Sequence, residues 1–534
     1  MTSTRQPTGE FPAVESPGIV AGGAASAEAE AATRDGADDP DTTVTDGRAP
    51  ASYKVAPIIA VLVVSAFVMI LNETLLSVAL PALMDDLSIS AVTAQWLSTG
   101  FMLTMAVVIP TTGFLMKRLS VRAVFLTAML LFLGGTAFAT LAPTFGVLLV
   151  ARVIQAAGTA MVLPLLMTTV LALVPISKRG LVMGLVGVVI SAAPALGPSI
   201  SGFILEHWSW HSLFVMMLPI IVVALVIGLL FMRNYTEPEK VRLDLVSVVL
   251  SAVGFGGVIY ALASISQIVE GEARLIPLIA AGVGVLALAV FSTRQVRMHS
   301  RGEEPLLDLR PLQVRTFTVS VAVILMGFAT MLGTVVALPL YMTGSLGMST
   351  LDVGLTMLPG AAASGVLGPF VGTLYDRVGP RPIVVPGMAL MAIVCWLEVF
   401  LLDADAGQGL IIALNVPLGI GMAMVMTPLM ALSLGALPRD LYGHGSAILN
   451  TLQQLAGALG TAVFIALLTL GAVVATESGA AAQVAQASGV GWAFAFGGVM
   501  TTIAVGLALT LRAIPAEQGS AADESTQAPA AGTA

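Results

Sequence analysis

Two charged residues interrupt long apolar segments of the sequence, and they are the side chains best placed to do chemistry there. Glu73 lies in the apolar run 56–78, and Arg152 lies in the run 145–174. Ionisable groups at membrane depth are costly to bury and are usually functional where they occur. A carboxylate held away from water is suited to taking up and releasing a proton, which makes Glu73 a candidate proton carrier.

Arg152 needs compensation for its charge, because a lone guanidinium in hydrocarbon is very unfavourable. If the two runs are helices that cross in opposite directions, a rise of about 1.5 Å per residue puts Glu73 and Arg152 within about one helical turn of the same depth. Gln155 follows Arg152 at a spacing of three, near the same helix face. The sequence therefore predicts that Glu73 and Arg152 act together in proton coupling, and a purely structural ion pair is the alternative.

Neutral polar residues in the apolar runs are candidates for lining a small-molecule cavity. Because the chain contains 26 methionines and 20 phenylalanines, such a cavity is expected to be apolar and adaptable in shape. The candidates are Asn72, Gln95, Trp96, Gln155, Asn415, Asn450, Gln453 and Gln454. Glu398 is a further acid within an apolar run, and its place in the internal repeat described below assigns it to a peripheral helix.

Other kinds of reactive site are missing from the sequence. The four histidines lie near the ends of apolar runs and have no metal-ligand spacing. The sequence has no glycine-rich phosphate loop and no nucleophile triad. We therefore expect no metal, no other cofactor and no enzymatic activity, and an ion gradient as the source of energy.

Composition identifies the class of protein. The 534 residues are 57% hydrophobic and 10% charged, with a mean hydropathy of +0.96, whereas soluble domains carry about 25% charged residues. This excludes an ordinary soluble enzyme, a nucleic-acid-binding protein and a disordered chain, and it leaves a polytopic membrane protein. The net charge of −8 lies in the termini, since residues 1–54 hold nine acids and four bases and residues 513–534 hold three acids and no base. Both tails are predicted to be disordered.

Fourteen apolar runs are long enough to cross about 30 Å of hydrocarbon as helices. Their approximate ranges are 56–78, 92–115, 123–141, 145–174, 180–204, 211–232, 244–264, 275–293, 317–342, 352–374, 382–402, 409–434, 444–472 and 490–512. With both termini in the cytoplasm, 21 of the 23 lysines and arginines fall on the cytoplasmic side, as the positive-inside rule requires. A missed or additional helix would reverse every later loop, so this distribution favours an even number of spans.

Two loops on the predicted cytoplasmic side repeat one another. Residues 113–122 read GFLMKRLSVR and residues 372–381 read GTLYDRVGPR, so Gly, Leu, Arg and Arg coincide at equal offsets. The copies are eight helices apart, which fits a duplicated six-helix unit with two helices inserted between the copies. The expected organisation is a cytoplasmic tail (1–54), a six-helix bundle (55–232), two inserted helices with a cytoplasmic linker (233–316), a second six-helix bundle (317–512) and a second tail (513–534).

These motifs resemble those of the major facilitator superfamily, specifically its fourteen-helix drug:proton antiporter family, over about residues 56–512. The resemblance rests on the loop 372–381, on Arg152 to Gly158 in the fourth run, on Gly184 with 197–202 in the fifth, on 71–81 in the first, and on the landmarks 208–219 and 305–310. The chain departs from the family pattern at several positions. Lys117 stands where the family loop has Asp, Ala193 and Ser201 replace glycines, and Asn72 replaces an Asp, with Glu73 as the next residue.

The resemblance implies a role for each matched motif. It implies that Arg152 takes part in proton transfer. From its own chemistry, Asp376 is expected to cap the next helix and to pair with a base on a neighbouring helix, forming a latch that breaks as the inner gate opens, which Lys117, as a cation, cannot do. The implied antiporter elbow, kinked by proline, is Gly184, Gly197, Pro198 and Gly202. The implied cytoplasmic gate is Gly113, Arg118, Gly372, Asp376, Arg377 and Arg381.

The expected function is proton-coupled export of lipophilic drug-like molecules or antibiotics across a bacterial cytoplasmic membrane. The expected partners are the small-molecule substrate, protons and the lipid bilayer, with no nucleic acid, and the protein is expected to be a monomer. Within transport, the alternative is export of an endogenous metabolite or amino acid. From a different class, the alternative is a membrane sensor or scaffold that has kept the fold without transport.

The topology predicts which loops an impermeant thiol reagent reaches in intact cells. In a Cys395→Ala background, a cysteine at Ser478 should react from outside, because it lies in a predicted outer loop, whereas a cysteine at Gln313 should not. The measurement is mass tagging of whole cells, with permeabilised cells as the control for both positions. The reverse pattern of labelling would contradict the predicted orientation.

Overall fold

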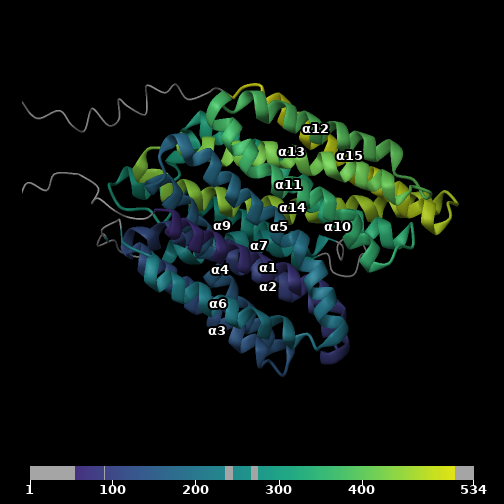
Figure 1. Cartoon of the computed structure of the whole chain (residues 1–534), viewed down its shortest axis with the longest axis horizontal. Helices are drawn as coiled ribbons and strands as arrows, with labels where there is room; N and C mark the ends of the chain where they lie inside the picture. Colours follow the sequence, from purple (N-terminus) through teal and green to yellow (C-terminus); the bar gives the residue numbers. More distant parts are fainter. Residues whose placement is uncertain (1–54, 90, 235–237, 239–243, 266–274, 512–534) are drawn as a thin grey trace, which may run out of the picture. The chain divides into compact units, whose positions relative to one another are not determined.

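The computed structural model describes residues 55–89, 91–234, 238, 244–265 and 275–511, which form fourteen α-helices and two short 3-10 helices without a β-strand (Figure 1). Thirteen of the α-helices are long and apolar enough to cross a membrane, and α5, with 32 residues, is the fourteenth. The all-α, fourteen-helix membrane architecture predicted from the sequence is confirmed. Both predicted tails lie outside the described residues.

The helices are α1 (Val55–Leu87), α2 (Ala91–Arg118), α3 (Val121–Thr140), α4 (Phe145–Leu173), α5 (Ile176–His207), α6 (His211–Phe231), α7 (Leu245–Ala263), α9 (Leu275–Ser300), α10 (Arg315–Gly344), α11 (Thr350–Val378), α12 (Arg381–Leu401), α13 (Gln408–Gly435), α14 (Tyr442–Glu477) and α15 (Ala482–Ala508). Several extend beyond the apolar runs. α1 continues to Leu87 and α9 to Ser300, because a hydropathy pattern ends at the first charged residues whereas a helix continues into the interface.

Helix ends are set by residues in the short loops. Ser120 Oγ accepts a hydrogen bond from the Ala123 amide at the start of α3, and Ser349 Oγ accepts one from the Asp352 amide at the start of α11. Gly379 ends α11 with a φ of +78°, a backbone conformation that favours glycine. Between these ends the apolar runs remain helical, because every amide inside a membrane must be bonded within the chain.

The helices on either side of the inserted pair pack mainly among themselves. In the first half, α1 packs against α4, α5 and α6, α2 packs against α4, and α3 packs against α4 and α6. In the second half, α10 packs against α13, α14 and α15, and α12 packs against α13 and α15. The halves meet through α5 with α11 and through α2 with α14. We call the end of the helices that carries Lys117, Arg179, Arg377 and Arg439 the basic-loop end.

The contact between α5 and α11 near the basic-loop end is made by glycines. A β-carbon added to Gly184 would lie 2.5 Å from the carbonyl oxygen of Gly368, and one added to Gly372 would collide with the carbonyl of Gly180. Only glycine lets two helix backbones approach this closely. We call this contact of four glycines the glycine seam, and it closes the basic-loop end between the two halves.

Toward the opposite end, α5 and α11 each pack against a helix of their own half. Gly197 of α5 lies against Thr74 of α1, and Gly360 of α11 lies against Asn415 of α13. The closest approach of α5 to α11 is therefore confined to the basic-loop side.

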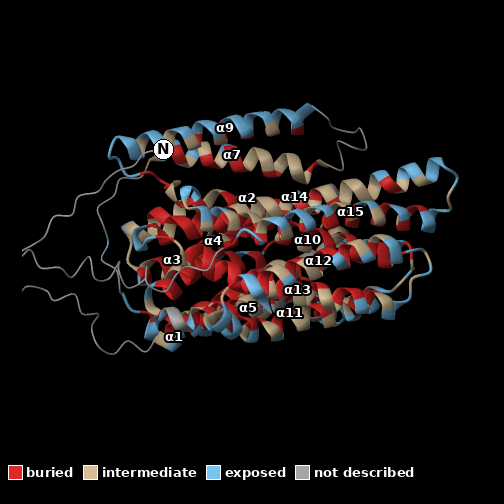
Figure 2. Cartoon of the chain, turned by 90° about the horizontal axis from the view of Figure 1, so that it is seen from above, coloured by how far each residue is buried: buried red, intermediate tan, exposed pale blue. Residues whose placement is uncertain are grey.

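The inserted helices α7 and α9 pair with each other and lie beside α2 and α14. A β-carbon on Gly257 of α7 would lie 3.0 Å from the α-carbon of Gly284 of α9, so glycines also allow the close approach of these two helices. Most of α9 faces outward, as Figure 2 shows by its exposed residues. An ion pair between Asp244 Oδ2 and Arg294 Nε, 2.8 Å apart, ties the start of α7 to α9.

The glycine seam predicts unequal effects of two glycine substitutions on α5. Gly184→Ala should destabilise the protein, because overpacking a close contact costs about 1–3 kcal/mol and the neighbouring atoms are backbone. Gly202→Ala is the matched control, since Gly202 is exposed with no atom within 4 Å of an added β-carbon. The measurement is the melting temperature of the purified protein in detergent. Equal melting temperatures for the two variants would contradict the seam.

Candidate functional site

Arg152 lies in the interior of the first half, fully buried on α4. Its Nη1 donates a hydrogen bond to Gln155 Oε1 at 3.1 Å, and its Cζ lies 4.0 Å from the ring centroid of Phe101 of α2. A cation over an aromatic face is stabilised by the ring, most strongly when water is excluded. Nε and Nη2 have no hydrogen-bond partner among the described residues, so the guanidinium keeps donors available for another group.

Gln155 is held in turn by α3. Its Nε2 donates to Thr136 Oγ1 at 2.9 Å, which orients the amide oxygen toward Arg152. α3 and α4 approach closely at glycines, because a β-carbon on Gly158 would lie 2.5 Å from the carbonyl of Ala128. The spacing of Arg152 and Gln155 was visible in the sequence. Phe101 and Thr136 were not, because single phenylalanines and threonines in apolar runs usually face lipid or core.

Glu73 lies on α1, close enough to Arg152 for the two charges to interact. No ion pair with an N···O distance of 4.0 Å or less joins them in the described part of the chain, so Arg152 is not neutralised by direct contact. The arrangement therefore leaves Glu73 and the free donors of Arg152 near one another without a closed bond between them.

The residues beside Glu73 attach α1 to α5. Thr74 Oγ1 lies 3.3 Å from the carbonyl of Ala193, and Ser201 Oγ donates to the carbonyl of Leu75 at 2.9 Å. Ala193 and Ser201 are the two positions where the sequence departs from the family's glycines, and here they serve as contacts to α1. Asn72 is buried, and its Nδ2 has no partner among the described residues.

α5 remains helical across the predicted elbow at Gly197 and Pro198. Gly184 belongs to the glycine seam, and Gly197 packs against Thr74. Gly202 is exposed and contacts no neighbouring helix. The side chain of Pro198 lies outside the described ones, as does that of Gln95.

The other residues predicted to line a cavity do not lie together in one site. The ring of Trp96 stacks on Tyr260 of α7 with 5.6 Å between centroids, so it faces an inserted helix. Asn415 Nδ2 donates to the carbonyl of Met357 at 3.3 Å and ties α13 to α11. Asn450 Nδ2 donates to the carbonyl of Ser446 within α14. Gln453 of α14 is buried, and Gln454 is half-buried.

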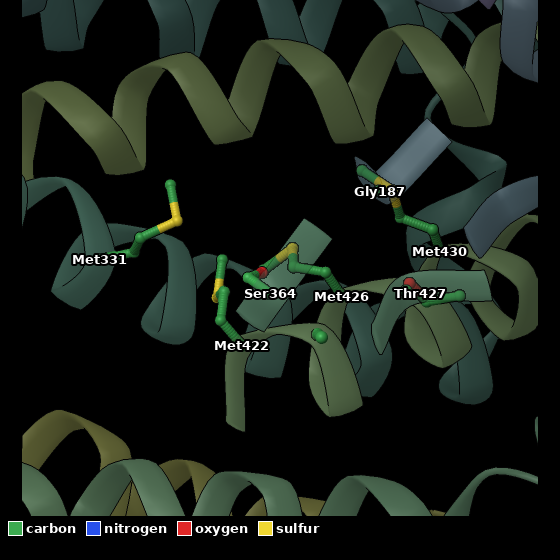
Figure 3. A pocket seen from close by; sticks show the side chains of 9 residues that line it. Gly187, Met331, Ser364, Met422, Met426, Thr427 and Met430 are labelled. Atoms are coloured by element: carbon green, nitrogen blue, oxygen red, sulfur yellow. The ribbon is translucent and has the colours of Figure 1, made fainter. Parts of the chain in front are cut away.

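A small cavity of about 20 Å³ lies between α5, α10, α11 and α13 (Figure 3). We call it the methionine cavity. Its walls are apolar and contain no charged side chain, and Thr427 Oγ1 is buried there without a hydrogen-bond partner among the described residues. Its lining residues are Gly187, Met331, Ser364, Gly368, Met422, Ala423, Met426, Thr427 and Met430. The sequence predicted an adaptable apolar pocket but gave no sign that methionines would dominate it or of which of the 26 methionines form it.

The gate residues lie at the basic-loop end in separate contacts, and Asp376 caps α5 instead of the next helix, α12, which the sequence had suggested. Asp376 of α11 accepts hydrogen bonds from the backbone amides of Gly180 at 3.0 Å and Leu181 at 3.3 Å, near the start of α5. A carboxylate at a helix N-terminus is stabilised by the amides and the helix dipole. Gly113 of α2 faces the start of α14, where a β-carbon would lie 3.2 Å from His444 Nδ1. The matched gate arginines at the surface are Arg118, Arg377 and Arg381.

Lys117, the cation at the position matching Asp376, has a different partner. Its Nζ lies 3.0 Å from Glu304 Oε2, in the linker after α9. Glu398 is buried on α12, and its Oε2 has no partner among the described residues. Because α12 packs against α13 and α15, Glu398 lies in the second half, away from Arg152.

Comparisons with known proteins agree with this geometry. The chain matches the model of the Major Facilitator Superfamily over residues 62–245 and again over 237–461. It is 39% identical over 461 residues to the lincomycin resistance protein LmrB of Listeria monocytogenes, covering 85% of this chain and 96% of that protein. It is 29% identical over 429 residues to the tetracenomycin C resistance and export protein of Streptomyces glaucescens, covering 79% and 76%.

Solved structures share the fold at low sequence identity. The human organic anion transporter MFSD10 superimposes with a TM-score of 0.61 at 14% identity, covering 86% of this chain and 100% of that one. The chain belongs to the Major Facilitator Superfamily and to its drug:proton antiporter family, and it is a multi-pass protein of the cell membrane.

Proposed function

We propose that the chain is a proton-coupled antiporter that exports lipophilic drugs or antibiotics from a bacterial cell. The observation that carries this proposal is the fully buried guanidinium of Arg152, whose Nε and Nη2 have no partner in the described part of the chain while Glu73 lies nearby. A static structural pair would close this contact, whereas a proton carrier must be able to form it and release it. The drug-resistance relatives support the same function.

Coupling then follows from the charge on Glu73. When Glu73 is ionised, it is attracted to the free donors of Arg152 and favours the arrangement of α1 and α4 that brings the two closer. When Glu73 takes up a proton, the attraction is lost, and the charge of Arg152 is then stabilised only by its contacts with Gln155 and Phe101 among the described residues. A proton thus biases one conformation against another, which is the requirement for driving transport.

The substrate is proposed to contact the methionine cavity. Thioether side chains are flexible and polarizable, so four of them accommodate apolar groups of different shapes. The unpartnered hydroxyl of Thr427 offers one hydrogen bond to a polar group on the substrate. The cavity of about 20 Å³ has room for roughly one water molecule, so it must enlarge to bind a drug.

Enlargement is linked to the gate through shared residues. Gly368 belongs to both the cavity and the glycine seam, and Gly187 lies one helical turn beyond Gly184. With the basic-loop end facing the cytoplasm, opening the seam widens the cavity toward the cytoplasm, and closing it compresses the cavity and lowers the affinity. This order of events suits export, and we propose that the two halves move against each other around the cavity.

Replacement of the carboxyl of Glu73 should abolish uphill export. Glu73→Gln keeps the size and the hydrogen-bonding groups but cannot carry a proton, so accumulation against a gradient should fall at least about tenfold while substrate binding remains. Arg152→Ala should have the same effect on accumulation. The measurement is proton-driven uptake of a fluorescent lipophilic dye into inverted proteoliposomes, with substrate-induced proton release recorded in parallel.

The matched control is Glu398→Gln, a buried carboxyl of α12 whose Oε2 has no hydrogen-bond partner among the described residues. It should pump at the wild-type rate. Export at the wild-type rate by the Glu73→Gln protein would place the coupling site elsewhere. If the unmodified protein transports neither dyes nor antibiotics, an exporter of metabolites or a non-transporting scaffold is favoured instead.

Loss of the charge on Asp376 should weaken closure of the basic-loop end. Asp376→Asn removes a carboxylate that accepts two backbone amides at the start of α5, an interaction worth about 1 kcal/mol, or roughly fivefold in the population of the closed state. Turnover should slow accordingly. Asp352→Asn, at the other end of the same helix, is the control and should leave the transport rate unchanged. Equal rates for the two variants would argue against this role of Asp376.

A further inference from the structure

The linker between α9 and α10 carries the PLLDLR motif at residues 305–310, which neither the coupling pair nor the methionine cavity uses. We propose that residues 304–310 form a clasp that holds the basic-loop end closed. The clasp bridges α2 in the first half to α14 in the second, and the inserted pair of helices α7 and α9 is its anchor.

The attachment to the first half is an ion pair. Glu304 Oε2 lies 3.0 Å from Lys117 Nζ, in the last turn of α2. The Lys117 side chain is 29% exposed and that of Glu304 is 52% exposed, so the pair is accessible to solvent. Solvent screens the attraction, which makes this the weaker and more easily released side of the clasp.

The attachment to the second half combines a buried hydrogen bond with an exposed ion pair. The backbone amide of Asp308 donates to His444 Nδ1 at 3.2 Å, and both residues are buried at the start of α14. The Asp308 carboxylate accepts hydrogen bonds from Arg310 through Nε at 2.8 Å and through the backbone amide at 2.9 Å. The Nη2 of Arg310 also lies 3.4 Å from Asp440 Oδ2, just before α14.

The anchor is made by apolar burial and by the amide of Gln295. Leu306 and Leu307 are buried in the main core, which fixes the middle of the clasp. The Leu307 amide donates to Gln295 Oε1 of α9 at 3.3 Å, and Gln295 Nε2 donates to Ser247 Oγ of α7 at 2.6 Å. These two hydrogen bonds attach the clasp to the inserted helices, in addition to its contacts with the two halves.

Opening of the basic-loop end must break this bridge. α2 and α14 are in contact there, since a β-carbon on Gly113 would lie 3.2 Å from His444 Nδ1. If the two helices separate, one short segment cannot stay bound to both, and the exposed pair of Lys117 with Glu304 yields first. The clasp also gives a reason for the lysine at this loop position, because the aspartate found in the family pattern would face the carboxylate of Glu304.

A charge-exchange experiment tests the clasp without measuring transport. In a Cys395→Ala background, a cysteine at Met430 reports opening, because Met430 is buried in the methionine cavity beside the glycine seam. The measurement is its rate of labelling by an impermeant maleimide added to inside-out vesicles. Lys117→Glu and Glu304→Lys should each raise the rate about two- to fivefold, the range for an exposed ion pair. The double exchange should return the rate to within about twofold of wild type.

Two controls separate the clasp from general loss of structure. Glu303→Lys changes the charge of the adjacent exposed residue and should leave the rate unchanged. At the buried attachment, His444→Leu removes the acceptor of the Asp308 amide and should raise the rate, whereas His444→Asn keeps an acceptor and should stay near wild type. Unchanged labelling in both single exchanges, or no recovery in the double exchange, would overturn the proposal.

Discussion

A guanidinium inside a membrane must find its partners within the protein, and much of the first half is arranged around this requirement. Arg152 donates a hydrogen bond to the amide oxygen of Gln155 and lies over the ring of Phe101. The Gln155 amide is oriented in turn by the hydroxyl of Thr136 on a third helix. The close approach of α3 to α4 at Gly158 keeps these groups in register. Among the described residues this compensation is incomplete, so the guanidinium keeps donors for a further group, and the carboxylate near it is that of Glu73 on α1.

The closed end of the transporter depends on weak contacts of several kinds. Glycine backbones touch at the seam, one carboxylate caps the start of α5, and an exposed ion pair joins α2 to the linker. Each contact is worth little alone, so no single one of them holds this end closed. Together they still favour the closed arrangement, because all of them form only when α5 lies against α11 and α2 lies against α14.

The sequence was most informative where a physical pattern is local. Continuous apolar runs predicted the fourteen helices, and the spacing of Arg152 and Gln155 placed them near one helix face, where the structure joins them by a hydrogen bond. Contacts between distant segments were not predictable. Lys117 binds Glu304, 187 residues later, and Trp96 stacks on Tyr260 because an inserted helix lies beside α2. The methionine cavity was equally hidden, since its members resemble every other buried methionine in composition and hydropathy.

The glycine seam also has an electrical consequence. Peptide backbones in van der Waals contact leave no room for water between α5 and α11 at the four glycines, so the seam separates the two faces of the membrane along this contact. A gate made of long charged side chains would keep hydrated gaps through which protons leak. Backbone contact at the seam leaves no such gap. Protons therefore do not leak through the seam while the opposite end binds or releases substrate.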